Sequence, residues 1–331
     1  MSRVSVIGGG AWGTSLTILL AEKGHAMTFW LFEEDLVAEI KEFHENRRFL
    51  PGFQIPETVE ITSDPAAAKG SEILFFVVPT QFSRTAARRF APFVSPSAII
   101  VSAAKGIEEK TLKLPVEILR EELKNENLCA LSGPNLASEV ARGLPAATVV
   151  ASLEEGNARA VQESLMLDRF RVYTNTDIVG VQLGGALKNV IAIASGIAFG
   201  LNLGDNAKSS MMVRGIAEIA RLGITLGAKI ETFAGLSGIG DLIVTCSSRL
   251  SRNHQVGERI AKGEKLKDIL TSMKKVAEGV PTAIAARELG NKLKVSLPIT
   301  EEIYNVLYQG KDPYWAINDL MTRSPKTEFN E

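Results

Sequence analysis

The sequence has little of the chemistry that crosslinks a chain or binds metal ions. Cys129 and Cys246 are its only cysteines among 331 residues, and they are far apart. Two isolated cysteines exclude a disulfide scaffold and a zinc cage built on cysteines, and they indicate a reducing compartment. The histidines at positions 25, 44 and 254 do not have metal-ligand spacing, so we predict no metal site.

An excess of charge of one sign and long hydrophobic runs are also lacking. The 37 Lys and Arg residues balance 38 Asp and Glu residues, which leaves a net charge of −1. This balance gives no global attraction to nucleic acid or to an anionic membrane. The longest apolar run, residues 190–201, is too short to span a bilayer, and the N-terminus enters a strand-like run without a signal peptide. We therefore expect a soluble, cytoplasmic protein without membrane insertion.

The hydrophobic pattern changes part-way along the chain. With 45% hydrophobic and 23% charged residues, the composition is that of a globular protein of about two domains. Short β-branched runs first alternate with helical stretches, which predicts βαβ crossovers and a mainly parallel sheet. Beyond about residue 180 the pattern is helical. We predict an α/β fold with a Rossmann-like domain at 1–180 and an all-helical domain at 181–331.

The individual elements follow from the same patterns. The predicted strands are residues 4–7, 27–32, 73–78, 98–101, 128–131, 147–151 and 171–174. The predicted helices are residues 14–23, 181–200, 207–227, 230–233, 257–262, 282–293 and 298–309.

A glycine-rich turn follows the first predicted strand. Residues 8–13 (GGGAWG) fit the pattern GxGxxG. In dinucleotide-binding folds the first glycine permits a tight turn and the second lets the backbone approach a pyrophosphate. The third lets helix and strand pack closely. We therefore predict that Gly8, Gly10 and Gly13 belong to a dinucleotide site, with a plain glycine-rich turn as the alternative.

Acidic residues follow the second predicted strand. Glu33 lies 20 residues beyond Gly13, near the distance at which an acidic residue usually meets the adenosine ribose. Together with Glu34 and Asp35 it would repel a 2′-phosphate, which favours NAD over NADP. A solvated helix start is the alternative, because acidic side chains also suit the helix dipole. Arg47 and Arg48 could still reach a 2′-phosphate.

Lys188 lies in an otherwise apolar predicted helix. A buried lysine is costly unless it is paired or takes part in chemistry, and desolvation lowers its pKa toward the range of general acid–base catalysis. A lysine that extends to solvent from a helix is the alternative. Asp241 ends the glycine-rich segment 234–241. It could form an ion pair with a buried lysine or cap the following helix.

Several polar residues have the chemistry of a substrate site. Ser251, Arg252 and Asn253 begin a predicted helix and could hold a phosphate, although a solvated arginine beside an ordinary cap explains them too. Lys105 and the segment 132–135 follow predicted strands, at the sheet edge where ligands of such folds bind.

Taken together, these residues resemble the NAD(P)-dependent glycerol-3-phosphate dehydrogenases. The resemblance covers nearly the whole chain in order. The matching segments are GGGAWG (8–13), HENRRFLPG (44–52), FFVVPTQF (75–82), AAKGIE (103–108), SGPNLASEVARGLP (132–145), VGVQLGGALKNVIAIASGI (179–197), LSGIGDLIVTC (236–246), SRN (251–253) and PITEEIYNVLY (298–308).

The resemblance implies roles for individual residues. Lys188 would donate and accept the proton at the substrate carbinol, Lys105 would contact the substrate, and Asp241 would support Lys188. The implied substrate site further includes Gly133, Asn135, Asn189, Ser251, Arg252 and Asn253. The implied dinucleotide site includes Gly8, Gly10, Ala11, Trp12, Gly13, Phe32, Phe82, Lys105, Ala137, Arg252, Val276 and Glu278. Ala11 departs from the Ser or Asn often found in the family, and Phe32 occupies a position that is basic or histidine in many bacterial members.

The implied function is reversible hydride transfer between NAD(P)H and dihydroxyacetone phosphate, giving sn-glycerol 3-phosphate for phospholipid synthesis. Family habit further implies a homodimer. Two alternatives stay open. A β-hydroxyacid dehydrogenase of the same architecture would need a carboxylate site in place of residues 251–253. A non-catalytic dinucleotide sensor would have no need of a buried proton donor.

Overall fold

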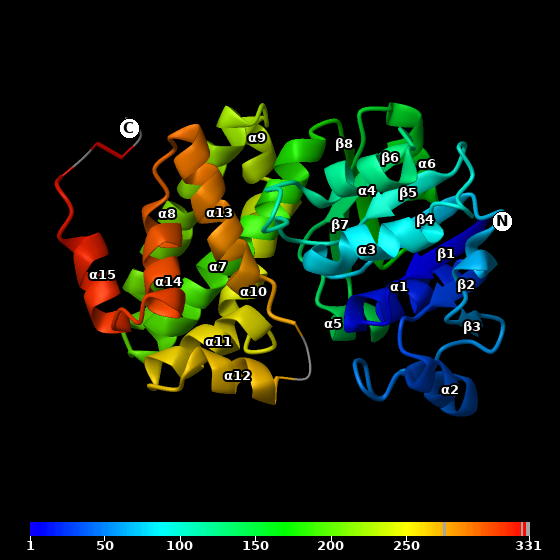
Figure 1. The fold of residues 1–331 in the computed structure, drawn as a ribbon, viewed down its shortest axis with the longest axis horizontal. Coiled ribbons are helices and arrows are strands. Elements are labelled where there is room, and N and C mark those ends of the chain that lie inside the picture. Colours follow the sequence, from blue (N-terminus) through cyan, green and yellow to red (C-terminus); the bar gives the residue numbers. More distant parts are fainter. Residues whose placement is uncertain (274–275, 326, 329–331) are drawn as a thin grey trace.

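A sheet-containing half and a helical half lie side by side in the computed structural model (Figure 1). The structure describes residues 1–273, 276–325 and 327–328. The helical half begins with α7 (Ile178–Gly200). This architecture confirms the predicted α/β fold class, whereas the division into domains at residue 180 stays a prediction.

The eight strands form one sheet in the order β3-β2-β1-β4-β5-β6-β7-β8. They are β1 (Arg3–Ile7), β2 (Ala26–Trp30), β3 (Glu60–Thr62), β4 (Ile73–Phe76), β5 (Ile99–Ser102), β6 (Leu128–Ser132), β7 (Ala146–Ala151) and β8 (Phe170–Asn175). β1 pairs in parallel with β2 and β4, and Val4 lies opposite both Met27 and Ile73. The strand order therefore reverses next to β1, the point at which open α/β sheets bind ligands.

The sheet is parallel except at one pair. β7 runs antiparallel to β6, with Leu131 opposite Val150, while β8 is parallel to β7. Between β6 and β7 the chain forms only α5 (Ala137–Ala141), a five-residue helix. The connecting segment 133–145 turns back near the end of β6, so β7 begins at the edge of the sheet where β6 ends and the two strands run antiparallel. The predicted mainly parallel sheet is thus confirmed, with a reversal that the sequence pattern did not predict.

Both faces of the sheet are covered, which explains the continuous apolar run of β4. Phe75 packs into the core on one face, and Leu74 and Phe76 pack into the core on the other. Side chains alternate between the two faces of a strand, so a strand covered on both sides has no polar face. The remaining elements of this half are α1 (Ala11–Glu22), α2 (Glu34–Phe43), the 3₁₀ turn η1 (Pro65–Ala68), α3 (Thr80–Phe90), α4 (Pro115–Leu123) and α6 (Glu155–Leu165).

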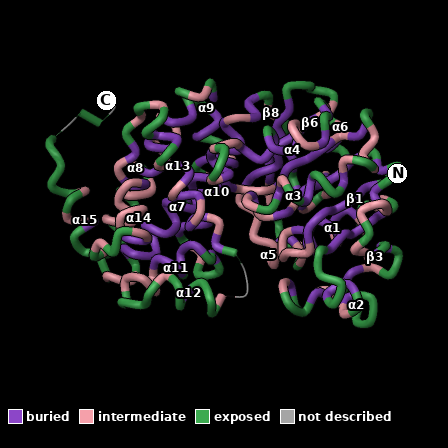
Figure 2. The backbone as a smooth tube through the Cα atoms, viewed as in Figure 1, coloured by how far each residue is buried: buried purple, intermediate pink, exposed green. Residues whose placement is uncertain are grey.

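α7 is the central helix of the helical half. It is buried along most of its length and packs against α8, α10, α11, α13 and α14 (Figures 1 and 2). The other elements here are α8 (Gly204–Thr225), α9 (Ile230–Phe233), the π-helical turn η2 (Leu236–Gly240), α10 (Asp241–Ser247), α11 (Arg252–Ala261), α12 (Leu266–Ser272), α13 (Gly279–Leu293), α14 (Pro298–Tyr308) and α15 (Pro313–Met321).

Two glycines allow α7 and α11 to approach each other closely. A Cβ atom on Gly257 would lie 2.0 Å from the Ile193 carbonyl oxygen, and one on Gly196 would lie 2.0 Å from the His254 carbonyl oxygen. Neither position has room for a side chain. This contact holds the N-terminal turn of α11 beside the middle of α7.

Nearly all of the apolar run at residues 190–201 is part of a longer apolar helix, α7, in the structure. α7 has 23 residues and a mean hydropathy of 1.5 over its most apolar window, which is long and apolar enough to cross a membrane. However, 94% of that window is buried inside the protein. Burial against the neighbouring helices, rather than a short length, therefore accounts for its composition.

The predicted elements agree with the structure to within a few residues at most ends. α1 begins at Ala11 rather than at residue 14, directly after the glycine turn. α7 begins three residues earlier than predicted, where the Asp177 side chain caps it by accepting a hydrogen bond from the Gly180 N–H at 2.8 Å. The short strand β3 was not predicted.

Candidate active site

The glycine turn connects β1 to α1 and has a geometry that explains its glycines. Gly8 has a φ of +123°, and a Cβ atom there would lie 2.7 Å from the Val77 carbonyl oxygen. A Cβ atom on Gly13 would lie 2.0 Å from the Gly8 carbonyl oxygen. Next to Gly10, in contrast, no atom from elsewhere in the described part of the chain lies within 4 Å of the corresponding position. The turn is therefore packed tightly on its inner side and open at Gly10, next to the N-terminus of α1.

Most other predicted cofactor residues follow strands at the same edge of the sheet. Phe32 follows β2, Phe82 lies in the first turn of α3 after β4, and Lys105 follows β5. Phe32 and Phe82 are each 59% exposed, so both rings are accessible at this edge. Ala137 begins α5 after β6. Trp12, in the first turn of α1, is half-buried and packs against the core of the sheet.

A carboxylate shared by two lysines lies where the two halves meet. The Asp241 side chain, 1% exposed, accepts hydrogen bonds from the Nζ atoms of Lys188 on Oδ1 and of Lys105 on Oδ2, the latter at 2.6 Å. Lys105 Nζ also donates to the Gly133 carbonyl oxygen at 3.0 Å. Lys188 comes from α7 and Lys105 from the sheet half. Asp241 is thus an ion-pair partner rather than a helix cap, and Lys188 does not extend to solvent.

Glycine makes this cluster possible as well. A Cβ atom on Gly185 would lie 2.6 Å from the Ser132 hydroxyl and 3.4 Å from Cγ of Lys105. A Cβ atom on Gly184 would lie 2.4 Å from the Ser237 carbonyl oxygen. The glycine pair therefore lets α7 approach the Lys105 side chain on one side and the segment leading to Asp241 on the other.

Burial shifts the acidity of Lys188. Desolvation lowers the pKa of this lysine to about 8, opposed by the attraction of Asp241 and assisted by the repulsion of Lys105. A lysine with a pKa near 8 is an ammonium group at neutral pH and releases its proton more readily than a surface lysine. The arrangement can therefore deliver a proton to, or take one from, a group placed beside Nζ.

A chain of amides connects α7 with α11 and α13. Asn189 Nδ2 donates to the Lys105 carbonyl oxygen at 3.1 Å, and Asn189 Oδ1 accepts from Asn253 Nδ2 at 2.9 Å. Asn253 Oδ1 in turn accepts from the Gly279 N–H at 2.9 Å. Ser251 caps α11, as predicted, by accepting from the His254 N–H at 3.3 Å. Of the predicted phosphate residues, Asn253 is thus held in a network beside the lysine cluster, and Ser251 caps the helix that carries it.

Arg252 differs from its two neighbours. Its side chain is exposed, whereas Ser251 and Asn253 are buried. It forms no hydrogen bond or salt bridge with any residue that the structure describes, which leaves a guanidinium group available at the N-terminus of α11. Electrostatic attraction comes from Glu278, just before α13. Val276, two residues before Glu278, is 41% exposed.

Glu278 reaches from the helical half to the sheet half. Its Oε1 atom accepts a hydrogen bond from the Thr80 N–H at the start of α3, at 3.1 Å. Its Oε2 atom is buried without a hydrogen-bond partner in the described part of the chain. Desolvation raises the pKa of this carboxyl to about 7.

The acidic residues after β2 lie at the start of α2, as the helix-start alternative also predicts. Glu33 is the N-cap residue and Glu34 and Asp35 form the first turn. Arg48 donates hydrogen bonds to Asp35 at 2.8 Å and to Glu39 at 3.0 Å, so its charge is already paired. Arg47 lies over the Phe43 ring, 3.7 Å from its centre. Neither arginine is a free cation at the edge of the sheet.

The structure adds residues that the sequence analysis did not single out. The Thr245 hydroxyl accepts a hydrogen bond from Lys188 Nζ at 2.7 Å and donates to the Asp241 carbonyl oxygen at 2.6 Å. Its position four residues after Asp241, on the same face of α10, is the signal that could have identified it. Thr80 has no such signal, because only its backbone N–H takes part.

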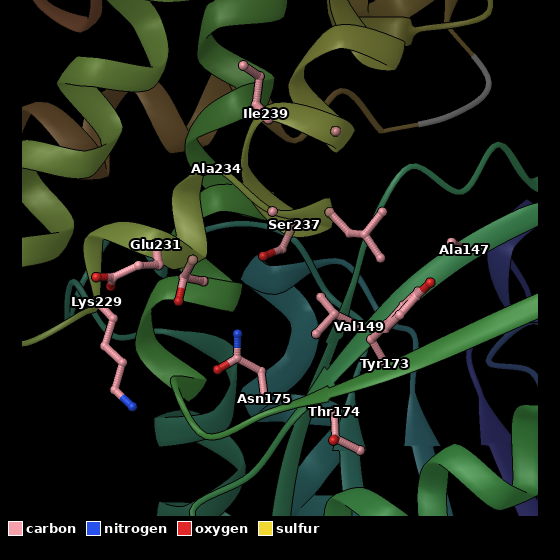
Figure 3. Close-up of a pocket in the computed structure, with 14 residues that line it drawn as sticks. Ala147, Val149, Tyr173, Thr174, Asn175, Lys229, Glu231, Ala234, Ser237 and Ile239 are labelled. Carbon is pink, nitrogen blue, oxygen red and sulfur yellow. The ribbon is translucent and has the colours of Figure 1, made fainter.

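An open pocket of about 650 Å³ lies next to this site without including it (Figure 3). It is lined by residues of β7 and β8 on one side and of α9 and η2 on the other, among them Val149, Tyr173, Glu231 and Ile239. None of the predicted site residues lines it. In the described ranges, no group of three or more His, Cys, Asp and Glu side chains is arranged to hold a metal ion.

Sequence comparison places the chain in a family. The profile for the NAD-dependent glycerol-3-phosphate dehydrogenase N-terminus matches residues 3–158, and the profile for the C-terminus of the same enzymes matches residues 177–318. The chain belongs to the NAD-dependent glycerol-3-phosphate dehydrogenase family. The two matched regions correspond to the sheet half and the helical half.

Individual relatives agree with this family. The chain is 48% identical to glycerol-3-phosphate dehydrogenase [NAD(P)+] of Citrifermentans bemidjiense over 330 residues, with 98% of each chain covered. It is also 48% identical to the enzyme of that name from a Geobacter species, with the same coverage. The crystal structure of glycerol-3-phosphate dehydrogenase from Coxiella burnetii superposes with a TM-score of 0.93 at 34% identity, covering 97% of this chain and 99% of that chain. These matches support the glycerol-3-phosphate dehydrogenase interpretation over a β-hydroxyacid dehydrogenase and over a non-catalytic sensor.

Proposed function

We propose that this protein interconverts dihydroxyacetone phosphate and sn-glycerol 3-phosphate, with Lys188 as the proton donor and acceptor. The observation that carries the proposal is the buried Lys188–Asp241–Lys105 cluster where the sheet half meets the helical half. Family membership supplies the reaction, and the cluster supplies the proton chemistry that the reaction needs.

The glycine turn fits a dinucleotide. Gly10 is open to its surroundings, and the N-terminus of α1 directly after it favours negative charge such as a pyrophosphate. We propose that Gly8, Gly10, Ala11, Trp12 and Gly13 hold the pyrophosphate. The further proposed contacts are Phe32, Phe82, Lys105, Ala137, Arg252, Val276 and Glu278. A bound nicotinamide supplies the hydride that reaches C2 of the substrate.

Lys188 then acts at the oxygen on C2. As an ammonium group it stabilises the developing alkoxide and protonates it, and in the oxidation it takes the proton back. Asp241 holds both lysines and keeps Lys188 charged against the cost of burial. Lys105, with its side chain 19% exposed, also contacts the substrate. Thr245 helps to fix the direction of Nζ by accepting one of its hydrogen bonds.

Arg252 anchors the far end of the substrate. Its guanidinium, which has no salt-bridge partner among the described residues, can form a bidentate contact with a phosphate, while Ser251 and Asn253 shape the N-terminal turn of α11 around it. Gly133, Asn135 and Asn189 complete the substrate site. Binding energy from a remote phosphate can orient the carbonyl toward the hydride and the proton.

We further propose a preference for NAD. The acidic start of α2 disfavours a 2′-phosphate, and Arg48 is already paired with Asp35 and Glu39. A free cation does lie nearby: the Arg89 guanidinium is 4.7 Å from the centre of the Phe32 ring and forms no salt bridge with a described residue. Arg89 is therefore the residue that would hold a 2′-phosphate if NADP were preferred.

The setting of the enzyme is proposed on family grounds. We propose a cytoplasmic homodimer that does not insert into membranes and whose product supplies the backbone of phospholipids. The burial of α7 within its own helical half supports the absence of membrane insertion.

The test compares two substrates before and after the mutation Arg252→Ala. If Arg252 forks onto the phosphate, kcat/KM for dihydroxyacetone phosphate should fall at least ~10-fold more than kcat/KM for unphosphorylated dihydroxyacetone. Arg252→Lys should recover only part of the activity, because lysine lacks the fork. Arg249→Ala is the control, because Arg249 precedes Arg252 by only three positions but its guanidinium lies over the Phe199 ring, 5.5 Å from the ring centre. An unchanged substrate ratio in Arg252→Ala would overturn the phosphate assignment.

A further inference from the structure

Asn46 is fully buried, and it is not among the residues proposed above to contact the cofactor or the substrate. It lies in the segment 44–55, which follows α2 and folds back on itself. The Ile55 N–H donates to the His44 carbonyl oxygen at 2.7 Å, and the Gly52 N–H donates to Glu45 Oε1 at 2.7 Å. This closed segment places the Asn46 side chain against the glycine turn.

Both the nitrogen and the oxygen of the Asn46 side-chain amide form hydrogen bonds. Nδ2 donates to the Gly9 carbonyl oxygen and to the Thr14 hydroxyl, both at 2.8 Å, and Oδ1 accepts from the Phe49 N–H at 3.1 Å. A carbonyl can only accept and a backbone N–H can only donate, so the orientation of the amide is settled by its partners. The Thr14 hydroxyl in turn donates to the Gly10 carbonyl oxygen at 3.0 Å.

These bonds fix two successive peptide planes of the turn. In a trans peptide the C=O and N–H groups point in opposite directions. Holding the Gly9 carbonyl therefore aims the Gly10 N–H away from Asn46, and holding the Gly10 carbonyl aims the Ala11 N–H in the same way. No residue in the described part of the chain accepts a hydrogen bond from the Gly10 N–H, and the space beside Gly10 is open.

We propose that Asn46 is a positioning residue for the dinucleotide pyrophosphate, which it serves by fixing the peptide planes of Gly9 and Gly10 before the cofactor binds. Three consecutive glycines have more backbone freedom than any other tripeptide, so an unrestrained turn would lose entropy on binding. Asn46 removes that freedom in the free protein. The inference rests on the proposed function, in which the glycine turn holds the dinucleotide.

The experiment measures cofactor affinity and substrate affinity separately in the full-length protein. Asn46→Ala and Asn46→Asp should each raise the Kd for NADH about tenfold or more, because each removes both donated hydrogen bonds. The Kd for ADP-ribose, which contains the same pyrophosphate, should rise by a similar factor. The KM for dihydroxyacetone phosphate at saturating NADH should stay within about twofold of wild type.

A matched control separates positioning from general stability. Asn125 is also buried, and its Nδ2 donates to the carbonyl oxygens of Ser95 and Ala98, but it precedes β6 at the opposite edge of the sheet. Asn125→Ala should leave the Kd for NADH unchanged. If Asn46→Ala does not fold, the same Kd for NADH is measured in Thr14→Val. This substitution preserves the shape of the side chain but removes the hydroxyl that connects Asn46 to the Gly10 carbonyl oxygen, so the Kd should rise.

The outcomes distinguish this inference from the proposed function. A wild-type protein that neither binds NADH nor reduces dihydroxyacetone phosphate overturns the proposed function. An active wild-type protein with a folded Asn46 variant whose NADH Kd is within about twofold of wild type overturns the role of Asn46 alone. An equal loss of affinity in Asn125→Ala also overturns it.

Discussion

Replacing Asp241 with Asn should shift the pH dependence of the reductive reaction far toward acid. Asp241 is the carboxylate that both Lys188 and Lys105 share, and its attraction opposes the desolvation that lowers the pKa of Lys188 to about 8. Without that negative charge, two ammonium groups would face each other in a buried site. Lys188 would then lose its proton at a lower pH, and the proposed mechanism of reduction uses the protonated form.

The size of the shift follows from the charges. Two unit charges about 4 Å apart interact by about 4 kcal/mol at an effective dielectric constant of about 20. At about 1.36 kcal/mol per tenfold change in protonation, this corresponds to as much as about 3 pH units. Near pH 7.5 the protonated fraction of Lys188 should therefore fall by as much as about 200-fold, and the rate of reduction with it.

The assay follows NADH oxidation at saturating dihydroxyacetone phosphate from acidic to alkaline pH. In the wild type the rate should fall as pH rises through about 8, where Lys188 loses its proton. In Asp241→Asn the rate should fall at a lower pH than in the wild type, and the variant should regain activity as the pH is lowered. Asp319→Asn is the control, because Asp319 bonds Lys311 at 2.6 Å on the surface. A loss of activity that is equal at every pH would refute the reasoning.

Four further results are expected. Lys188→Ala should lower kcat by about 10²- to 10⁴-fold and leave the Kd for NADH unchanged; a kcat within about threefold of wild type would remove its assigned role. NADH should give a kcat/KM at least comparable with NADPH, and a preference for NADPH of about 100-fold would contradict this. Gly257→Ala, whose Cβ would lie 2.0 Å from the Ile193 carbonyl oxygen, should cost about 1–3 kcal/mol of unfolding free energy. Gly156→Ala in α6, with open space around it, should be neutral or stabilising in thermal unfolding.

Local patterns in the sequence were enough to predict the class of fold and the place of the glycine turn. The GGGAWG segment directly after a β-branched run predicted a strand, a tight turn and a helix, and β1, Gly8 and α1 have that arrangement. The apolar run at 73–78 predicted a strand covered on both faces, which is β4. These features depend on residues within about ten positions of one another, so backbone sterics and side-chain alternation specify them.

Contacts between distant residues were decided only by the tertiary structure. The sequence left Asp241 between a helix cap and an ion pair, whereas the fold brings it to Lys188, 53 positions away, and to Lys105, 136 positions away. It also left Lys188 between a buried and a solvent-facing lysine. Three other features could not be predicted from the sequence for the same reason: the reversed direction of β7, the hydrogen bonds of Thr245 and the buried amide of Asn46. Each depends on which loops close and which helices pack together, and such packing is a property of the whole chain rather than of any segment within it.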